Sequence, residues 1–300
     1  MGKLIRKATG LTVGVATLLA GLVLPMTASA ESASPIDVSP IIHYSFDNAL
    51  TSKTIANEGS AANSDATLSG DATVANGQIN LTGSQTISVP TTAIAGKKDV
   101  TVSIWLKNNY GNGNTAAAYI GAAKTGNYPA NGYWLLNPAN PSGYAKSVMT
   151  NATAAGPNNS PWGTEVGPGS TNAATIGTKA TSDLALYTTV ISGTNSTMSF
   201  YLNGKQVGDA TYTIPAGGLT NYGDLVAYIG KSSYADPNSK LDVDDYAVYD
   251  TAISAADVTK LYDAQVLDKA EAAVKAAVPA SATEDFALPT SAAGVSIAWK

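Results

Sequence analysis

Four oxygen-bearing side chains at the ends of two predicted strands could bind a metal ion. Asp47 and Asn48 follow the first strand pattern of the chain, and Asp244 and Asp245 lie in the last. Their oxygens suit Ca²⁺, which takes about six to eight oxygen ligands, including backbone carbonyls. If Val248 faces the core, strict alternation puts Asp244 on the same face, where an isolated charge is very costly. Two interpretations remain open: a bound calcium ion, and solvated acids in ordinary surface pairs.

Aromatic residues in polar loops could contact sugars, because sugar C–H faces stack on aromatic rings while polar groups bind the hydroxyls. Trp162 lies in the polar loop NNSPWG, and Tyr110 and Tyr128 lie in similar loops. Trp134, in the strand pattern YWLL, could face either way, whereas Trp105 is in phase with core residues and is expected to be buried. For each loop aromatic, packing onto its own loop is an equally good explanation.

Groups for bond hydrolysis are scarce. A glycosidase needs two carboxyl groups that face each other across the sugar bond. The chain beyond residue 30 has five glutamates, and none forms the Glu-x-Asp-x-x-Glu strand pattern of jelly-roll endoglucanases. His43 is the only histidine, and no Gly-x-Ser-x-Gly nucleophile elbow is present. We therefore assign no catalytic residue in this chain, and leave open whether a larger parent protein is an enzyme.

Short blocks of alternating apolar and polar residues predict many strands and little helix. They are residues 41–46, 78–81, 85–89, 100–106, 117–120, 133–136, 186–192, 198–202, 226–230 and 241–249. Asn203 and Gly204 suit the two positive-φ positions of a type I′ turn and predict a hairpin. Residues 110–179, rich in Gly, Asn, Pro and Ala, are interpreted either as loops and short strands at one edge of a sandwich, where binding surfaces often lie, or as an insertion without function.

The C-terminal part changes in composition. Ser254 is a candidate helix N-cap, with Asp257 three residues on, and helical periodicity continues until Pro279 ends it. Strand patterns follow at residues 286–289 and 295–299, and the sequence ends within the second of them. That ending suggests that the chain is the front portion of a longer protein.

The N-terminus has the features of a secretory signal peptide. Lys3, Arg6 and Lys7 form a positive head, residues 11–24 form an apolar run, and Ala30 ends a small-residue cleavage pattern. An uncleaved membrane anchor is the alternative, but the apolar run is short for a span of about 20 residues. We expect cleavage after Ala30 and a secreted protein without a membrane span, either free or associated with the cell surface.

Charge and cysteine content exclude other classes. The chain has 17 basic and 22 acidic residues, and three of the basic ones, including the only arginine, lie in the predicted signal peptide. The remaining excess of acidic residues provides no basic stripe for a phosphate backbone, so nucleic acid is not an expected partner. The absence of cysteine excludes disulfides and thiolate metal sites. About 270 residues can form one or two domains, and we expect a monomer.

Three segments together resemble the laminin-G-like, concanavalin A-like jelly-roll family. They match its opening strand, a hairpin, and its closing strand with the start of a helix: residues 42–48 (IHYSFDN), 200–205 (FYLNGK) and 243–254 (VDDYAVYDTAIS). The resemblance implies an all-β fold, a two-sheet antiparallel jelly-roll sandwich over residues 40–265, after the signal peptide 1–30 and a linker 31–39. It also implies a structural calcium ion at Asp47 and Asp244, with Asp245 and Asn48 as further ligands.

Residues 266–300 resemble the first half of an atypical bacterial immunoglobulin-like domain, on the segments LDKA, LPT and VSIAWK. Such a domain commonly lies between jelly rolls and a family 43-type arabinofuranosidase or xylosidase. The resemblance therefore implies a partial second β domain and a larger, secreted parent. It predicts a noncatalytic carbohydrate-binding module whose partner is a polysaccharide or glycan. Two alternatives stay open: the parent is an arabinan- or xylan-active glycoside hydrolase, or the module is a cell-surface adhesion or architectural unit.

Overall fold

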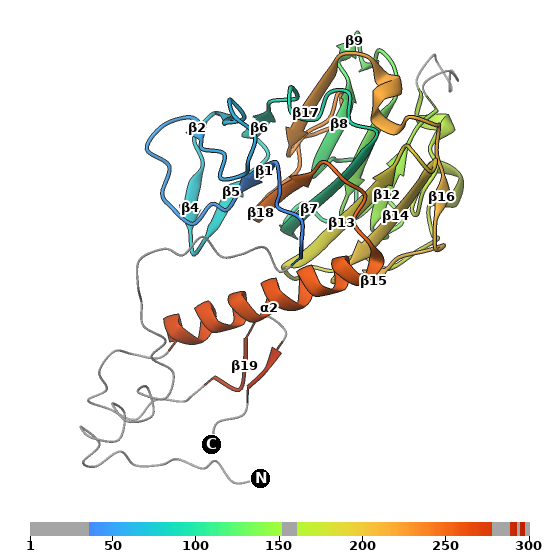
Figure 1. The fold of residues 1–300 in the computed structure, drawn as a ribbon. Helices are drawn as coiled ribbons and strands as arrows, with labels where there is room; N and C mark the ends of the chain where they lie inside the picture. Colours follow the sequence, from blue (N-terminus) through green and yellow to red (C-terminus); the bar gives the residue numbers. More distant parts are fainter. Residues whose placement is uncertain (1–35, 152–160, 278–288, 293–294, 298–300) are drawn as a thin grey trace, which may run out of the picture. The chain divides into compact units, whose positions relative to one another are not determined.

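Two large antiparallel sheets form a β-sandwich in the computed structural model of the chain (Figure 1). The structure describes residues 36–151, 161–277, 289–292 and 295–297. By their contacts these residues divide into two compact units, one of them Ile36–Tyr262 and the other beginning at Asp263. The predicted fold class, a mostly β, two-sheet antiparallel jelly-roll sandwich, is confirmed.

The first sheet has nine strands. They are β1 (Ile42–Tyr44), β4 (Thr73–Ala75), β5 (Gln78–Leu81), β7 (Asp99–Asn108), β13 (Ala185–Ser192), β14 (Thr197–Leu202), β15 (Lys205–Gln206), β16 (Tyr212–Thr213) and β18 (Leu241–Tyr249). The order across the sheet is β15-β14-β13-β7-β18-β5-β4, with β1 also paired to β18 and β16 to β14.

The second sheet has seven strands in the order β12-β11-β8-β17-β6-β3-β2. They are β2 (Thr54–Ile55), β3 (Ala66–Ser69), β6 (Thr86–Val89), β8 (Ala118–Ala122), β11 (Tyr133–Asn137), β12 (Lys146–Met149) and β17 (Leu225–Ile229). Two small hairpins pair β9 (Lys124–Thr125) with β10 (Tyr128–Pro129) and β19 (Ser291–Ala292) with β20 (Val295–Ser296). The helical elements are η2 (Pro161–Thr164), η3 (Thr171–Ala173), η4 (Gly218–Tyr222) and α2 (Ala255–Ala277).

The core forms between the sheets because alternate residues of each strand point the same way. On β7, Ile104 and Leu106 belong to the central buried cluster, and on β11 Trp134 and Leu136 belong to it. The Trp134 indole N–H donates to Ser147 Oγ at 3.1 Å, so the polar tip of this buried ring is hydrogen-bonded. The remaining residues of these strands face outward on both sides of the sandwich.

The outer face of the nine-stranded sheet is covered by the start of helix α2 (Figure 1). Asp257 N donates to Ser254 Oγ, which confirms Ser254 as the N-cap. Val258 and Leu261 then pack on this face of the sheet. Trp105 is buried, as predicted, but on this outer face, where it stacks with Tyr262 of the helix at 5.9 Å between ring centroids.

The predicted hairpin joins β14 and β15. Asn203 and Gly204 have φ values of 51° and 71°, the two positive values of a type I′ turn. Tyr201 pairs with Gln206 and Leu202 with Lys205 across it. The turn has the conformation that its Asn-Gly sequence predicts, and Asn203 Oδ1 also accepts a hydrogen bond from Leu186 N at 2.9 Å.

Residues 110–179 contain more regular structure than their composition indicates. They supply β8, β11 and β12, which lie on one side of the seven-stranded sheet and include its edge strand. The predicted location of these residues, as strands and loops at one edge of the sandwich, is confirmed. That they form a binding surface stays a prediction. The loops that follow β12 carry η2 and η3, and they lie over the outer face of this sheet's edge.

The predicted domain limits can be compared with the structure only in part. The predicted signal peptide, most of the linker and residues 286–288 lie outside the described residues. Ile36, placed in the linker by its sequence, is buried in the cluster under α2. The helix is continuous across residues 265 and 266, and the immunoglobulin-like domain beyond it stays a prediction. Within the described residues, no helix is long and apolar enough to cross a membrane.

Candidate functional site

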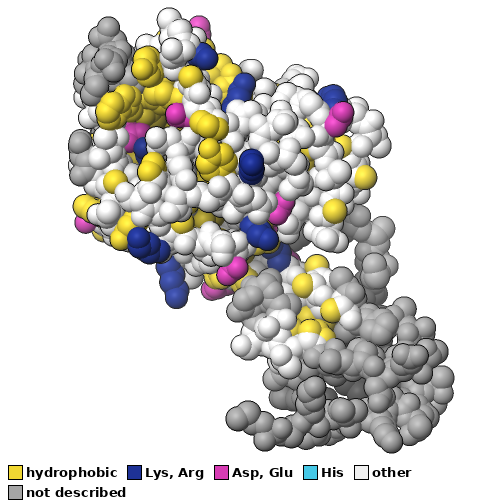
Figure 2. All heavy atoms as spheres, turned by 180° about the vertical axis from the view of Figure 1, so that it is seen from behind, with side chains coloured by type: hydrophobic (Ala, Val, Ile, Leu, Met, Phe, Trp, Pro, Cys, Tyr) yellow, Lys and Arg dark blue, Asp and Glu magenta, His cyan; other side chains and the backbone are white. Residues whose placement is uncertain are grey.

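A pocket of about 390 Å³ opens on the outer face of the seven-stranded sheet, above β11 and β12. Its volume lies near the lower end of the range for small-molecule sites, about 300–1,000 Å³. Aromatic, amide, hydroxyl and charged side chains line it: Asn114, Thr115, Tyr128, Tyr133, Leu135, Asn137, Asn140, Pro141, Ser142, Lys146, Trp162, Glu165, Gly169, Ser170, Thr171, Ala174, Tyr234 and Asp236. Figure 2 shows that hydrophobic side chains gather in one area of the molecular surface, with acidic and basic side chains beside them.

The floor of the pocket is aromatic. Tyr133 and Leu135 alternate with Trp134 and so face away from the core. The Tyr133 ring contacts Tyr119 in a stacked arrangement at 5.7 Å and Tyr234 edge-to-face at 5.5 Å. Tyr234 in turn meets Tyr128 edge-to-face at 6.1 Å. Offset and edge-to-face aromatic pairs each add about 0.5–1.5 kcal/mol beyond area burial, so this set of rings is fixed in place.

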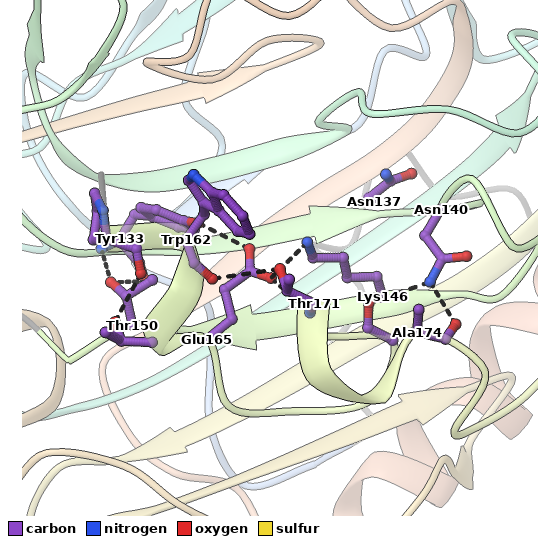
Figure 3. Close-up of polar contacts among 12 residues, drawn as sticks. Tyr133, Asn137, Asn140, Lys146, Thr150, Trp162, Glu165, Thr171 and Ala174 are labelled. Carbon is purple, nitrogen blue, oxygen red and sulfur yellow. Dashed lines mark hydrogen bonds and ion pairs between the residues drawn. The ribbon is translucent and has the colours of Figure 1, made fainter. Parts of the chain in front are cut away.

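A buried carboxylate joins the floor to the loop above it. Glu165 Oε1 accepts a 2.8 Å hydrogen bond from the Tyr133 hydroxyl. Its Oε2 accepts from Thr171 N at 3.1 Å and Thr171 Oγ1 at 2.9 Å, and pairs with Lys146 Nζ at 2.8 Å. The Glu165 side chain is 2 % exposed, and four donors compensate its charge (Figure 3). Glu165 therefore anchors the loop on strands β11 and β12.

The anchored loop presents Trp162. Pro161 opens the short helix η2, where a proline costs no hydrogen bond. Thr164 Oγ1 donates to Pro161 O at 2.7 Å and closes this short turn. Pro161 is buried while the Trp162 side chain stays partly exposed and lines the pocket, as Figure 3 shows beside Glu165. A large aromatic face is thus held open to solvent by its own loop.

Two asparagines shape the rim rather than face a ligand. Asn140 Nδ2 donates to Ala174 O at 2.7 Å, and its Oδ1 accepts from Ser142 N and Tyr144 N. Asn137 Nδ2 donates to Gly113 O at 2.7 Å. Because these amides are engaged with backbone groups, they fix the loops that bound the pocket.

The pocket lining has two acidic side chains and one basic side chain. Lys146 is the one basic side chain in the lining, and it is bound to Glu165. Asp236 is an exposed residue at the margin, where loss of hydration raises the pKa of its carboxyl and the nearby Lys146 charge acts in the opposite direction. The three groups together leave one negative charge when Asp236 is ionised.

Comparison with known sequences places the chain in a family. A laminin-G-type model described as the concanavalin A-like lectin/glucanases superfamily matches residues 81–259, more than half of the chain. The chain belongs to the concanavalin A-like lectin/glucanase superfamily. No curated protein sequence matches it.

Solved structures share this superfamily fold at low identity. Domain 4 of AbnA, a GH43 extracellular arabinanase from Geobacillus stearothermophilus solved in complex with arabinotriose, has 18% identity and a TM-score of 0.53 over 75% of this chain and 100% of its own. The receptor-binding domain of botulinum neurotoxin mosaic serotype C/D has 17% identity and a TM-score of 0.51, over 77% of this chain and 52% of its own. The chain thus spans about half of the toxin domain. At such identities these likenesses show the fold alone.

Of the four predicted sugar-contacting aromatics in this concanavalin A-like module, two line the pocket: Trp162 and Tyr128. Trp134 is wholly buried in the core, so its prediction as a contact residue is wrong. Tyr110 lies over Gly113, in a loop next to the pocket, and is absent from the lining.

Sequence reasoning missed Tyr133, Tyr234, Lys146, Glu165 and Asp236. One usable signal existed for Tyr133, because a strand that buries Trp134 must turn Tyr133 to the opposite face. The others are brought together from distant parts of the chain, and no local pattern marks them.

The predicted calcium ligands lie at the other sheet. Asp47 and Asn48 are exposed, whereas Asp244 is buried at 8% exposure and Asp245 Oδ1 binds His43 Nε2 at 3.0 Å. The expectation of strict alternation along β18 is wrong. The register shifts between residues 243 and 246, so a bulge at Asp244 and Asp245 interrupts the alternation.

These four residues offer the hard oxygen donors that calcium prefers. No group of three or more acidic or histidine side chains in the described part of the chain is placed to hold a metal. A calcium ion here would therefore also need backbone carbonyl or water ligands, which calcium accepts. The ion stays a prediction.

Proposed function

We propose that this chain is a noncatalytic carbohydrate-binding module of a secreted, multidomain, glycan-active protein, and that the pocket above β11 binds the glycan. The observation that carries the proposal is the partly exposed Trp162 over an aromatic floor, with hydroxyl and charged groups around it. Rings that stack on sugar faces, combined with a few polar groups that fix orientation, are what a glycan site requires.

The fixed loop supports binding. A loop that is ordered before the ligand arrives loses little conformational entropy on association, and this preserves affinity. Glu165 supplies that order through its bonds to Tyr133, Thr171 and Lys146. The same saturation argues against Glu165 as a general acid or base, because both of its oxygens already accept hydrogen bonds.

The superfamily and the arabinotriose complex of the similar arabinanase domain make arabinan oligosaccharides the first ligands to test. Export through a signal peptide at residues 1–30 belongs to the proposal, and N-terminal sequencing of the exported protein tests it.

The central experiment is a glycan array with the full chain, followed by calorimetry on arabinan, xylan, galactan and host-type glycans. The Trp162→Ala variant should bind at least about tenfold more weakly, the loss typical of a central aromatic contact. Tyr212→Ala, a partly exposed tyrosine on β16 of the other sheet, is the matched control and should bind normally. Absence of binding to every glycan by the folded protein, or normal binding by Trp162→Ala, would refute the proposal.

A further inference from the structure

The charges around the pocket bear on which glycans it accepts. Lys146 Nζ points at the Glu165 carboxylate, with Thr171 beside them (Figure 3), and the ion pair measures 2.8 Å. The two side chains are 15% and 2% exposed, so the pair is internal to the wall of the pocket. The positive charge of Lys146 is therefore compensated by Glu165 before any ligand binds.

We infer that the pocket selects neutral glycans and rejects those that carry carboxylate or sulfate groups. This inference rests on the proposed function and names the ligand class of the same site. Recognition of an anionic sugar needs a free cation, preferably an arginine fork. Within the described residues Lys146 is the one basic group in the lining, and the sequence has no arginine beyond Arg6.

An acidic sugar would have to share Lys146 with Glu165 or take the lysine away from it. Separating a buried pair leaves an uncompensated charge, which is strongly unfavourable. The Glu165 carboxylate would then repel the acidic group of the sugar. Asp236 at the margin would add further like-charge repulsion. A neutral sugar meets none of these costs, and its hydroxyls can donate to the Asp236 carboxylate at the margin.

The test uses matched pairs of ligands that differ only in charge. Galactan and branched arabinan, whose terminal arabinose residues keep a free primary hydroxyl, are each measured in native form, after partial oxidation of their free primary hydroxyls to carboxylates, and after reduction of those carboxylates back to alcohols. Sialylated and desialylated glycans on the array provide a second set. The oxidised and sialylated members should bind at least about tenfold more weakly than their neutral partners, because like charges repel each other across an interface. The reduced-back samples should recover the native affinity.

Two variants separate local charge from net charge. Asp236→Asn should lower the ratio of neutral to acidic affinity by about threefold or more, and Asp71→Asn should leave it unchanged. Asp71 is fully exposed, and it follows β3, which β8, β17 and β6 separate from β11. Salt should reduce the discrimination, since exposed charges are screened.

The outcomes are distinguishable. If no glycan binds at all, the proposed function fails and this inference fails with it. If neutral and acidic members bind equally, or the acidic members bind more tightly, glycan binding stands and the charge inference is overturned. An unchanged ratio in Asp236→Asn would overturn the role given to that residue.

Discussion

The Tyr133 hydroxyl donates a 2.8 Å hydrogen bond to Glu165 Oε1, and this contact joins the floor of the pocket to the loop that carries Trp162. Burial, followed by the negative charge of Glu165, raises the pKa of the Tyr133 hydroxyl well above its ordinary value. The tyrosine hydroxyl therefore keeps its proton at neutral pH and acts as the donor in this contact. Tyr234 also donates to the same hydroxyl at 3.1 Å, which extends the network across the face.

Removing this hydroxyl should destabilise the module. Tyr133→Phe keeps the ring contacts but loses a bond to a charged acceptor, which costs about 1.5–3 kcal/mol of unfolding free energy. Urea denaturation measures the loss. Tyr228→Phe, on the same face but partly exposed, is the control and should change stability by less than about 0.5 kcal/mol. Equal effects of the two substitutions would show that the Tyr133–Glu165 bond has no special role.

The Lys146–Glu165 pair should be strongly coupled. Glu165→Ala leaves Lys146 and three hydrogen-bond donors, on Tyr133 and Thr171, without their acceptor in a buried place. We therefore expect a loss of about 3–5 kcal/mol. A double-mutant cycle with Lys146→Met and Glu165→Gln should give a coupling energy above about 1 kcal/mol.

The control cycle uses Lys97 and Asp250, whose side chains pair at 2.8 Å but are 42% and 38% exposed. Exposed pairs of this kind contribute about 0–1 kcal/mol. A coupling at Lys146–Glu165 no larger than at Lys97–Asp250 would mean that burial adds nothing to the interaction.

The β14–β15 turn allows a test of backbone strain with a matched glycine. Gly204 has φ of 71°, and a Cβ there would lie 3.0 Å from the Tyr262 side chain. Gly96 has a similar φ of 76° with open space around it. Both alanine substitutions should lower the free energy of unfolding by about 1–2 kcal/mol, because a residue with a Cβ is unfavourable in the left-handed backbone conformation. Gly204→Ala should lose more in thermal or urea unfolding, because Tyr262 must also move.

The sequence predicts the sandwich well because its strongest signals are local. Asn203-Gly204 sets a type I′ turn by its own φ preferences, and Ser254 caps a helix through the Asp257 N–H three residues on. Alternation also locates β7 and β13 to within one or two residues. Such features depend on neighbours in the chain, so a single sequence is sufficient to find them.

The pocket could be predicted only in part, because its contacts are distant in sequence or ambiguous in face. Trp162 was found from its polar loop, but Tyr133 and Glu165 are 32 residues apart and Tyr133 and Tyr234 are 101 apart. All five residues of β11 are buried, some by the core and some by covering loops. Hydrophobicity alone therefore could not decide which of Tyr133 and Trp134 points to the outer face of the sheet and which to the core.

Asp99 should contribute stability that acid removes. Burial acts to raise the pKa of its carboxyl, but hydrogen bonds from Thr194 Oγ1 at 2.7 Å, Thr194 N and Ser192 Oγ outweigh burial and lower it. With the folded pKa below the unfolded value of about 3.9, the stabilisation is present above that value and lost as pH falls through the folded pKa. Urea unfolding between pH 6 and pH 2.5 measures it.

Asp99→Asn should reduce the loss of unfolding free energy at acidic pH, because an amide does not titrate and accepts hydrogen bonds only as a neutral group. Asp209→Asn, an exposed aspartate, serves as the control and should leave this loss unchanged. If Asp99→Asn loses as much unfolding free energy between pH 6 and pH 2.5 as the unmodified protein, the hydrogen bonds from Thr194 and Ser192 do not lower the pKa of Asp99 in the folded state.

Calcium binding at Asp47 and Asp244 is testable apart from glycan binding. A ligand that binds only the folded state stabilises it by RT ln(1 + [L]/Kd), about 2.7 kcal/mol at one hundred times Kd. Chelator should therefore lower the melting temperature by several degrees, and added Ca²⁺ should restore it while Mg²⁺ should not. Asp47→Asn should abolish the calcium response, and Asp71→Asn should retain it. A melting temperature that changes with neither chelator nor added calcium would exclude a stabilising ion. The carboxylates of Asp244 and Asp245 at the bulge would then be stabilised by protein groups alone.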